Sequence, residues 1–207
     1  MILKICGITN AEDATLACEA GANAIGFNFY PKSPRYILPE LAAEIPTPPG
    51  VKRVGVFVNE PREHVERVAL IARLDVAQLH GDEKPADYPR GFAIWKATRV
   101  AGPLNTVDAA KTVPFLNSPI EALLLDGPAG ELYGGSGKSF DWTLAAYSSM
   151  RIILAGGLDA TNVAQAIAMA RHAWGVDACS RIESAPGKKD PVKMTAFLAA
   201  AREAFRP

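Results

Sequence analysis

The chain has 207 residues, a length that fits one domain, and 49% of them are hydrophobic, enough for a sizeable core. Lysine plus arginine and aspartate plus glutamate each total 22, so the formal net charge is zero. This balance argues against nucleic-acid binding, which needs an excess of positive charge. No apolar run approaches the roughly 18 residues that a membrane-spanning helix needs, which argues against a membrane partner.

The predicted elements alternate between strand and helix along the whole chain. Strand-like runs in the first half are 2–6, 23–29, 51–58 and 75–79. Helical patterns follow them at 10–20, from Pro39, from Pro61 and, weakly, around Pro85. In the second half the strands are 92–98, 121–125, 151–155 and 174–179. The helices that follow are 103–114, which is the weakest, 140–148, 159–170 and one that starts at Asp190-Pro191.

Eight such units without a domain-sized insert predict a single-domain (β/α)8 barrel spanning residues 1–207. An open doubly wound sheet is the structural alternative. Its nucleotide fingerprint is missing, because the glycine-rich stretch 134–137 lacks the G-x-G-x-x-G spacing and does not directly follow a strand. The same stretch is not a Walker loop, since Leu132 stands where the first glycine should be.

The three cysteines are widely separated and form no C-x-x-C pair. This arrangement argues against both a zinc site and a disulfide framework. The segment from Met1 to Cys6 is too short for a signal peptide. We therefore expect a cytoplasmic protein with no metal site.

Two residues at strand ends are candidates for proton transfer, because reactive groups of such barrels gather at the carboxyl ends of the strands. Cys6 ends the first strand and could be a base or nucleophile, although a lone cysteine is more often a small buried residue. Asp126 ends the sixth strand before Gly127, where aspartate is also common as a turn residue. The apolar run 122–125 before Asp126 favours a protonated carboxyl group, which suits a general acid.

Small residues follow strands seven and eight, the pair of loops that often binds phosphate in these barrels. Gly156 and Gly157 could present backbone amides to a phosphate, and the alternative is a tight turn with close packing. Ser180 and Arg181 lie in the matching segment after strand eight. These positions favour a phosphate site.

Three further side chains could contact or support a bound substrate. Arg35 lies in a loop stiffened by two prolines and could face a carboxylate, although most such arginines are solvated. Gln78 and His80 end strand four and could support a catalytic group from behind. Hydrogen bonding to loop backbone is the alternative for both, and the favoured one for His80. Stretch 134–137 has the composition of a mobile lid or an ordinary loop.

These parts predict a phosphosugar isomerase or lyase that transfers protons without a cofactor, because no metal cluster, nicotinamide fingerprint or flavin signature is present. Short motifs in fixed order carry a more specific signal: KICGIT (4–9), GFNFY (26–30), SPRY (33–36), VGVF (54–57), QLHG (78–81), LD (125–126), GGSGK (134–138), FDW (140–142), LAGGL (154–158) and PGKKD (186–190). Together they resemble the phosphoribosylanthranilate isomerase family of tryptophan biosynthesis, essentially end to end. That family is a (β/α)8 barrel, in agreement with the count of units.

The resemblance implies an Amadori rearrangement of N-(5-phosphoribosyl)anthranilate. Asp126 would protonate the ring oxygen of the sugar, and Cys6 would remove the proton from C2 of the resulting iminium. The iminium is an electron sink within the substrate, so no cofactor or metal is expected. Arg35 would pair with the anthranilate carboxylate. The amides expected to hold the phosphate lie around Gly156, Gly157, Ser180 and Arg181.

One segment departs from the family pattern. Where the family usually reads Ser-Gly-Val-Glu, this chain has Ser180-Arg181-Ile182-Glu183, preceded by Cys179 instead of serine. The lost glycine at 181 could restrict the backbone of the phosphate loop. The arginine could also add a side-chain contact to the phosphate, or point to solvent.

Two other interpretations stay open. The first is the related histidine-pathway isomerase, which performs the same rearrangement. Members of that group resemble one another in having an aspartate at the end of strand one, where this chain has Cys6. The second interpretation is a non-catalytic barrel that binds phosphosugars. The expected partner is a small phosphosugar, and the chain itself is expected to be a monomer or homodimer.

Overall fold

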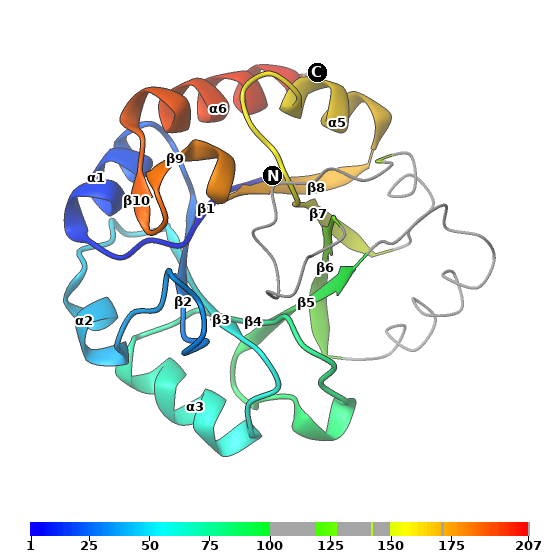
Figure 1. The fold of residues 1–207 in the computed structure, drawn as a ribbon. Coiled ribbons are helices and arrows are strands. Elements are labelled where there is room, and N and C mark those ends of the chain that lie inside the picture. The colour runs from blue at the N-terminus through cyan, green and yellow to red at the C-terminus, as the bar shows by residue number, and fades with distance from the viewer. Residues whose placement is uncertain (100–118, 128–141, 143–149, 171, 207) are drawn as a thin grey trace.

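Eight parallel strands close on themselves into a barrel in which they follow one another in chain order (Figure 1). The computed structural model describes residues 1–99, 119–127, 142, 150–170 and 172–206. Pairing of the last strand with the first completes the ring, so the predicted (β/α)8 barrel is confirmed. The strands are β1 (Ile2–Cys6), β2 (Ala24–Asn28), β3 (Lys52–Phe57), β4 (Val76–Leu79), β5 (Ala93–Arg99), β6 (Ile120–Asp126), β7 (Arg151–Leu154) and β8 (Ala173–Ala178).

Helices surround the barrel on its outer side (Figure 1). They are α1 (Ala11–Glu19), α2 (Pro39–Glu44), α3 (Arg62–Ile71), α5 (Val163–Met169) and α6 (Pro191–Ala204). The described connections include the 3-10 turns η1 (Pro85–Asp87) and η4 (Ser180–Ile182) and the hairpin of β9 (Glu183–Ala185) and β10 (Lys188–Lys189). Within the described residues, none of these helices is both long enough and apolar enough to cross a bilayer.

The helix ends that carry capping signals form as predicted. The Asn10 side chain accepts a hydrogen bond from the Asp13 amide at 2.8 Å and so caps α1. Asp190 caps α6 by accepting from the amides of Val192 and Lys193. Because each cap satisfies an amide that the first helical turn leaves unpaired, the starts of α1 and α6 are readable in the sequence.

Two predicted helices differ from the structure. The fourth is only the 3-10 turn η1, because Tyr88 precedes a proline, which disfavours helical backbone, and it is extended at φ −70° and ψ 132°. The seventh begins at Val163 rather than at Asp159, because the Asp159 side chain accepts a hydrogen bond from the Thr161 amide at 2.8 Å and forms a turn. The predicted helices 103–114 and 140–148 and the lid 134–137 lie outside the described residues, apart from Trp142, which is buried.

The barrel interior and the outer layer are two separate cores. Outward-facing residues of the strands pack against the helices, as Val65 and Val68 of α3 and Phe197 of α6 show. The interior core consists of Ile2, Ala24, Val54, Val76, Trp95, Ala97, Ala122, Leu124, Ile153 and Ala155. Since strand side chains alternate between the two faces, counting on by two from these residues reaches the side chains at the open end of the barrel.

Candidate active site

Cys6 lies at the carboxyl end of β1, directly above a charged pair in the barrel interior. Lys4 is fully buried two residues earlier on the same strand. Its Nζ lies 2.9 Å from each carboxyl oxygen of Asp177 on β8, and the strand register places Lys4 opposite Asp177. These two equal contacts fit an ammonium–carboxylate pair. Such a pair needs close geometry to offset the cost of burying two charges.

The surroundings of Cys6 favour its negatively charged form. A hydrogen bond with the Cys179 thiol and the positive charge of Lys4 lower the pKa of Cys6 well below its usual value, against the opposing effect of burial. The same charges change the pKa of Asp177, which pairs with Lys4. Burial raises the pKa of Asp177 to about 7, the negative charge of Cys6 adds to this, and Lys4 counteracts it.

Arg35 lies beside Cys6 and is bound by a carboxylate of this chain. Its Nε and Nη2 donate to the two carboxyl oxygens of Glu183, at 2.9 and 2.7 Å. Its side chain is 11% exposed, so the alternative of a solvated surface arginine is wrong. Gly7 makes this position accessible: its φ is +74°, and a Cβ there would lie 2.7 Å from Cδ of Arg35. Glu183 also accepts from Nζ of Lys189 at 2.8 Å.

Glu183 stays ionised through these two cations. Burial alone would raise the pKa of Glu183, but the hydrogen bond from Arg35 and the charge of Lys189 outweigh it and hold the pKa below its usual value. Glu183 thereby links the loop after β2 to the β9–β10 hairpin. The predicted proximity of Arg35 to a carboxylate is seen here with a protein carboxylate, and its contact with a substrate carboxylate stays a prediction.

Asp126 is buried at the end of β6 and forms a relay with β4. His80 Nε2 lies 3.2 Å from Asp126 Oδ2, and Gln78 Nε2 lies 3.3 Å from His80 Nδ1. The expectation that the His80 side chain bonds loop backbone is therefore wrong, because its ring lies between two side chains. Gln78 and His80 instead form a chain of contacts that ends at Asp126, and the supporting role that the sequence left open for them stays a prediction.

A second buried pair holds the chain just after His80. Glu83 accepts from the Gly81 amide with both carboxyl oxygens at 3.0 Å. Lys96 of β5 donates to the Gly81 carbonyl at 2.7 Å and lies 3.1 Å from Glu83. These contacts fix the backbone that leads away from the His80 ring.

The glycines after β7 allow the neighbouring loop to approach closely. Gly156 and Gly157 have φ values of +77° and +65°, a region that favours glycine. A Cβ on Gly156 would lie 2.3 Å from the Gly127 amide nitrogen and 2.8 Å from Asp126 Oδ1. Close packing against the catalytic candidate therefore explains Gly156, and phosphate binding by these amides stays a prediction.

Ser180 and Arg181 lie in η4, directly after β8. Arg181 Nη1 donates to Asp159 Oδ2 at 2.7 Å, which ties the loop after β8 to the loop after β7. Arg181 is not among the described residues with positive φ, so its backbone tolerates a side chain and the expected restriction is wrong. A contact between Arg181 and a phosphate stays a prediction.

The sequence interpretation missed four charged residues of this site: Lys4, Asp177, Glu183 and Lys189. A usable signal was present for the first two. Counting back by two from Cys6 reaches Lys4, and counting on by two from Gly175 reaches Asp177, so charged residues at these interior positions had to find a partner. Glu183 had no such signal, because its partner Arg35 is 148 positions away. Lys189 lies opposite Glu183 in the short hairpin and owes its place in the site to that contact.

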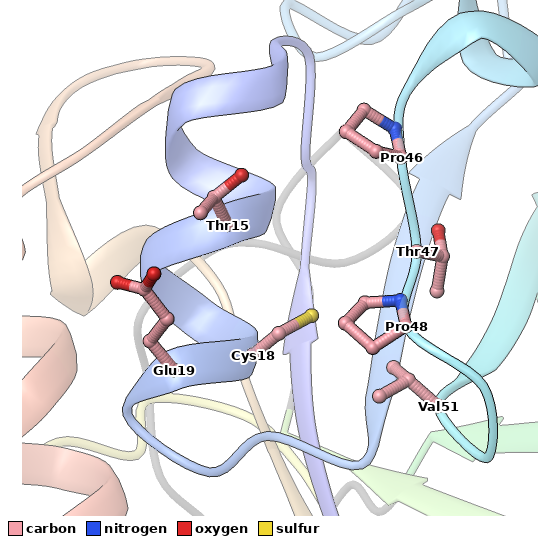
Figure 2. A pocket seen from close by; sticks show the side chains of 7 residues that line it. All are labelled: Thr15, Cys18, Glu19, Pro46, Thr47, Pro48 and Val51. Carbon is pink, nitrogen blue, oxygen red and sulfur yellow. The ribbon is translucent and has the colours of Figure 1, made fainter.

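A groove of about 460 Å³ lies away from these residues. Figure 2 shows it between the last turns of α1, with Thr15, Cys18 and Glu19, and the segment 46–51 that leads into β3. Connections from helix to strand lie at the end of the barrel opposite the catalytic one. None of the predicted site residues lines the groove, so it is not the active site.

Comparison with known proteins identifies the family. The model of a family described as N-(5'phosphoribosyl)anthranilate (PRA) isomerase matches residues 3–200. The chain belongs to this family. A relative from Solibacter usitatus, named N-(5'-phosphoribosyl)anthranilate isomerase, is 65% identical over 205 residues, which cover 99% of each chain.

Solved structures of the family agree with the fold. A phosphoribosyl anthranilate isomerase in complex with reduced 1-(o-carboxyphenylamino)-1-deoxyribulose 5-phosphate has a TM-score of 0.83 and 38% identity, and the match covers 98% of this chain and 100% of that one. Monomers generated from the dimeric enzyme of Thermotoga maritima match with a TM-score of 0.84, 38% identity and the same coverage. The barrel of this chain is therefore the barrel of the family.

Proposed function

We propose that the chain converts N-(5'-phosphoribosyl)anthranilate into 1-(2-carboxyphenylamino)-1-deoxyribulose 5-phosphate in tryptophan biosynthesis, with Asp126 and Cys6 carrying the proton transfers. The reaction follows from membership of the isomerase family, and the residue roles are the part proposed. The observation that carries them is the placement of Cys6 and Asp126. They end β1 and β6, strands well separated around one barrel, and both lie at its carboxyl end.

The first step is protonation of the sugar ring oxygen by Asp126. The bond between C1 and the ring oxygen then breaks, and the anilino nitrogen supplies the electrons that form an iminium. The His80 contact to Oδ2 orients the Asp126 carboxyl group. A buried carboxyl group suits this role, because a general acid must carry its proton when the substrate binds.

The second step is removal of the proton from C2 by Cys6, which gives an enolamine that tautomerises to the ketone. Buried charges around Cys6 favour the thiolate that a base requires. Lys4 lies beside Cys6 and pairs with Asp177. Farther out, Arg35 and Lys189 both pair with Glu183. The Cys6 thiolate brings these groups to neutrality. No cofactor enters either step, because the iminium itself accepts the electrons.

Substrate binding is proposed to use three further parts of the site. Arg35 reads the anthranilate carboxylate, either through its Nη1 edge or by exchanging partners with Glu183, whose carboxylate now occupies Nε and Nη2. The Arg181–Asp159 contact supports the phosphate role of the two loops, because it holds them together. The residues proposed to bind phosphate are Gly156, Gly157, Ser180 and Arg181.

The proposal extends to partners and location. A structure of the family contains a phosphosugar product analogue, which supports a phosphosugar substrate here. The Thermotoga maritima enzyme is described as dimeric, so a homodimer is proposed for this chain, with a monomer as the alternative. All three cysteines are free, which fits the proposed cytoplasmic location. We propose that residues 1–207 act as one domain, without a nucleic-acid or membrane partner.

Growth and turnover test this function together. The chain should restore growth without tryptophan to a host that lacks the isomerase, and its Cys6→Ala variant should not. The purified protein should turn over phosphoribosylanthranilate made in situ and leave the phosphoribosyl aminoimidazole of the histidine pathway unchanged. Turnover of the phosphoribosyl aminoimidazole alone would make the chain the histidine-pathway isomerase instead. Binding of a product analogue without turnover of either substrate would make the chain a phosphosugar-binding barrel.

A further inference from the structure

Two pairs of side chains lie one after the other where β1 meets β8: Lys4 with Asp177, and Cys6 with Cys179. The register places Lys4 opposite Asp177 and Ile5 opposite Ala178. Cys6, the last residue of β1, and Cys179, the first residue after β8, come next along the chain. Neighbouring strands lie about 4.8 Å apart, and Cys6 and Cys179 are each two residues beyond a member of the ion pair. The catalytic sulfur therefore has an ion pair beneath it and a second thiol beside it.

The Cys179 sulfur reaches toward Cys6 rather than away from it. A Cβ on Gly7, the residue after Cys6, would lie 3.1 Å from Cys179 Sγ. The two thiols share a hydrogen bond, which lowers the pKa of Cys6 and raises the pKa of Cys179. If Cys6 is the thiolate that the proposed reaction needs, Cys179 is the donor of this hydrogen bond.

The charges on every neighbouring element decide which sulfur holds the proton. Lys4 on β1 lies close to Cys6, since a Cβ on Gly26 would be 2.9 Å from Cys6 Sγ and 3.0 Å from Lys4 Nζ. Arg35 and Lys189 face Cys179, but both are bound to Glu183. Lys189 Nζ lies 2.8 Å from Glu183 and 4.0 Å from Cys179 Sγ. Glu183 offsets much of their charge, as Asp177 does for Lys4, and the nearness of Lys4 to Cys6 favours the thiolate there.

Two carboxyl groups complete the surroundings. Asp177 on β8 opposes a negative charge on Cys6 but is neutralised by Lys4 at 2.9 Å. Asp126 acts from β6 across the barrel and interacts with Asp177.

We propose that Cys179 is a positioning residue that donates its S–H to Cys6 and keeps the catalytic sulfur as a thiolate. This inference rests on the base role of Cys6 in the proposed function. Cys179 touches neither the substrate nor the transferred proton. It acts by holding the Cys6 sulfur in place and by sharing the negative charge until Cys6 accepts the proton from C2.

The test measures the protonation of Cys6 without any substrate. In a Cys18→Ala background, the rate of Cys6 alkylation by iodoacetamide is followed against pH by peptide mass, since only the thiolate reacts. The absorbance of the thiolate, taken as the difference between the protein and its Cys6→Ala variant, gives the same midpoint. This measurement does not depend on whether a reagent can reach the Cys6 sulfur. Cys179→Ala should move the midpoint up by about one pH unit or more, so that alkylation below the midpoint falls about tenfold or more.

Cys179→Ser is the matched control, because it keeps a hydrogen-bond donor of similar size. Its profile should stay near that of the parent. Cys179→Val supplies a second side chain without a donor, in case the alanine variant does not fold. Coincident profiles for all variants would overturn the inference, and so would a serine variant that shifts as far as alanine. Turnover decides the proposed function separately, because a protein that shows the shift but converts no substrate would contradict only that function.

Discussion

The two sides of the barrel mouth hold their catalytic groups in different ways. On the β1–β8 side, Cys6 is linked to a connected set of ion pairs with both signs of charge. On the β4–β6 side, Asp126 contacts an imidazole, which contacts an amide. The Lys96–Glu83 pair on that side acts on the backbone after His80 instead.

The difference matches the two proton tasks. A base that works as a thiolate needs a net positive surrounding, and the three cations and two carboxylates near Cys6 provide it. A general acid needs orientation, and the imidazole of His80 and the amide of Gln78 provide it. Environments that differ in this way are how a site assigns acid and base roles to two groups.

The largest expected effect comes from removing either catalytic group. Cys6→Ala and Asp126→Asn should each lower kcat by ~10²-fold or more, the usual contribution of a general acid or base. The affinity for a product analogue should change much less. Steady-state kinetics and analogue titration measure both, with Cys18→Ala as the control cysteine variant. Near-normal turnover by Cys6→Ala would remove the base role from Cys6.

The next effect separates charge from packing on the base side. Lys4→Met leaves the Asp177 carboxylate buried without its partner and should destabilise the fold by ~3–5 kcal/mol. Adding Asp177→Leu removes the unpaired charge and should restore most of the stability, as measured by denaturant unfolding. Turnover should stay low in the double variant, because Cys6 has lost its cation. Full recovery of both stability and turnover would show that Lys4 serves the fold alone.

A smaller effect is expected on the acid side. His80→Phe keeps a ring but removes the contact to Asp126, and the loss of the hydrogen bond that orients the acid should lower kcat by about tenfold. Gln78→Leu acts one contact farther away and should lower kcat less. KM should change little in either. If His80→Phe raised KM and left kcat unchanged, His80 would be a substrate contact instead of an orienting group.

Variants of Arg35 and Glu183 test the base side further, first through substrate binding and then through the pH dependence of stability. Arg35→Met should raise KM for the anthranilate adduct, since a charge-assisted contact contributes ~1.5–3 kcal/mol. Glu183→Gln keeps Arg35 in place and should raise KM less. Unchanged KM and kcat in Arg35→Met would leave the arginine as a purely structural partner of Glu183.

The Glu183 contribution to stability should depend on pH in one direction. Its folded-state pKa is lowered from 4.5 by Arg35 and Lys189 against the effect of burial. The native state therefore binds fewer protons than the unfolded state in this range, and stability falls as pH falls. The stability advantage over Glu183→Gln should be complete above pH 4.5 and shrink as pH drops through the lowered pKa. Denaturant unfolding at several pH values measures it, and an advantage that grows in acid would contradict the assignment.

The smallest effect is expected at Arg181. Its pair with Asp159 is partly exposed, and such pairs contribute ~0.2–1 kcal/mol, so Arg181→Gly should weaken product-analogue binding by about fivefold at most. High salt should reduce the difference. Asp159→Asn is the matched control. Equal losses would mean that the pair only joins the loops, and a clearly larger loss for Arg181→Gly would mean a direct phosphate contact.

The sequence by itself determined the barrel and the position of its chemistry. Apolar runs of strand length, caps such as Asn10 and Asp190, and the strand ends at Cys6 and Asp126 are local features, and the structure follows them. Local signals suffice here because each strand–helix unit repeats the same pattern, and eight units have few ways to bury their apolar faces. The same rule misjudged the fourth helix, where the restriction before a proline outweighs a weak helical pattern.

Only the tertiary structure decided which side chains act together. Lys4 and Asp177 are 173 positions apart, and Arg35 and Glu183 are 148 apart. His80 and Asp126 are 46 apart. These contacts depend on strand register and barrel closure, which bring together residues that share no local pattern. The sequence could therefore name Cys6 as a candidate, but only the closed barrel shows the charges and the second thiol that surround its sulfur.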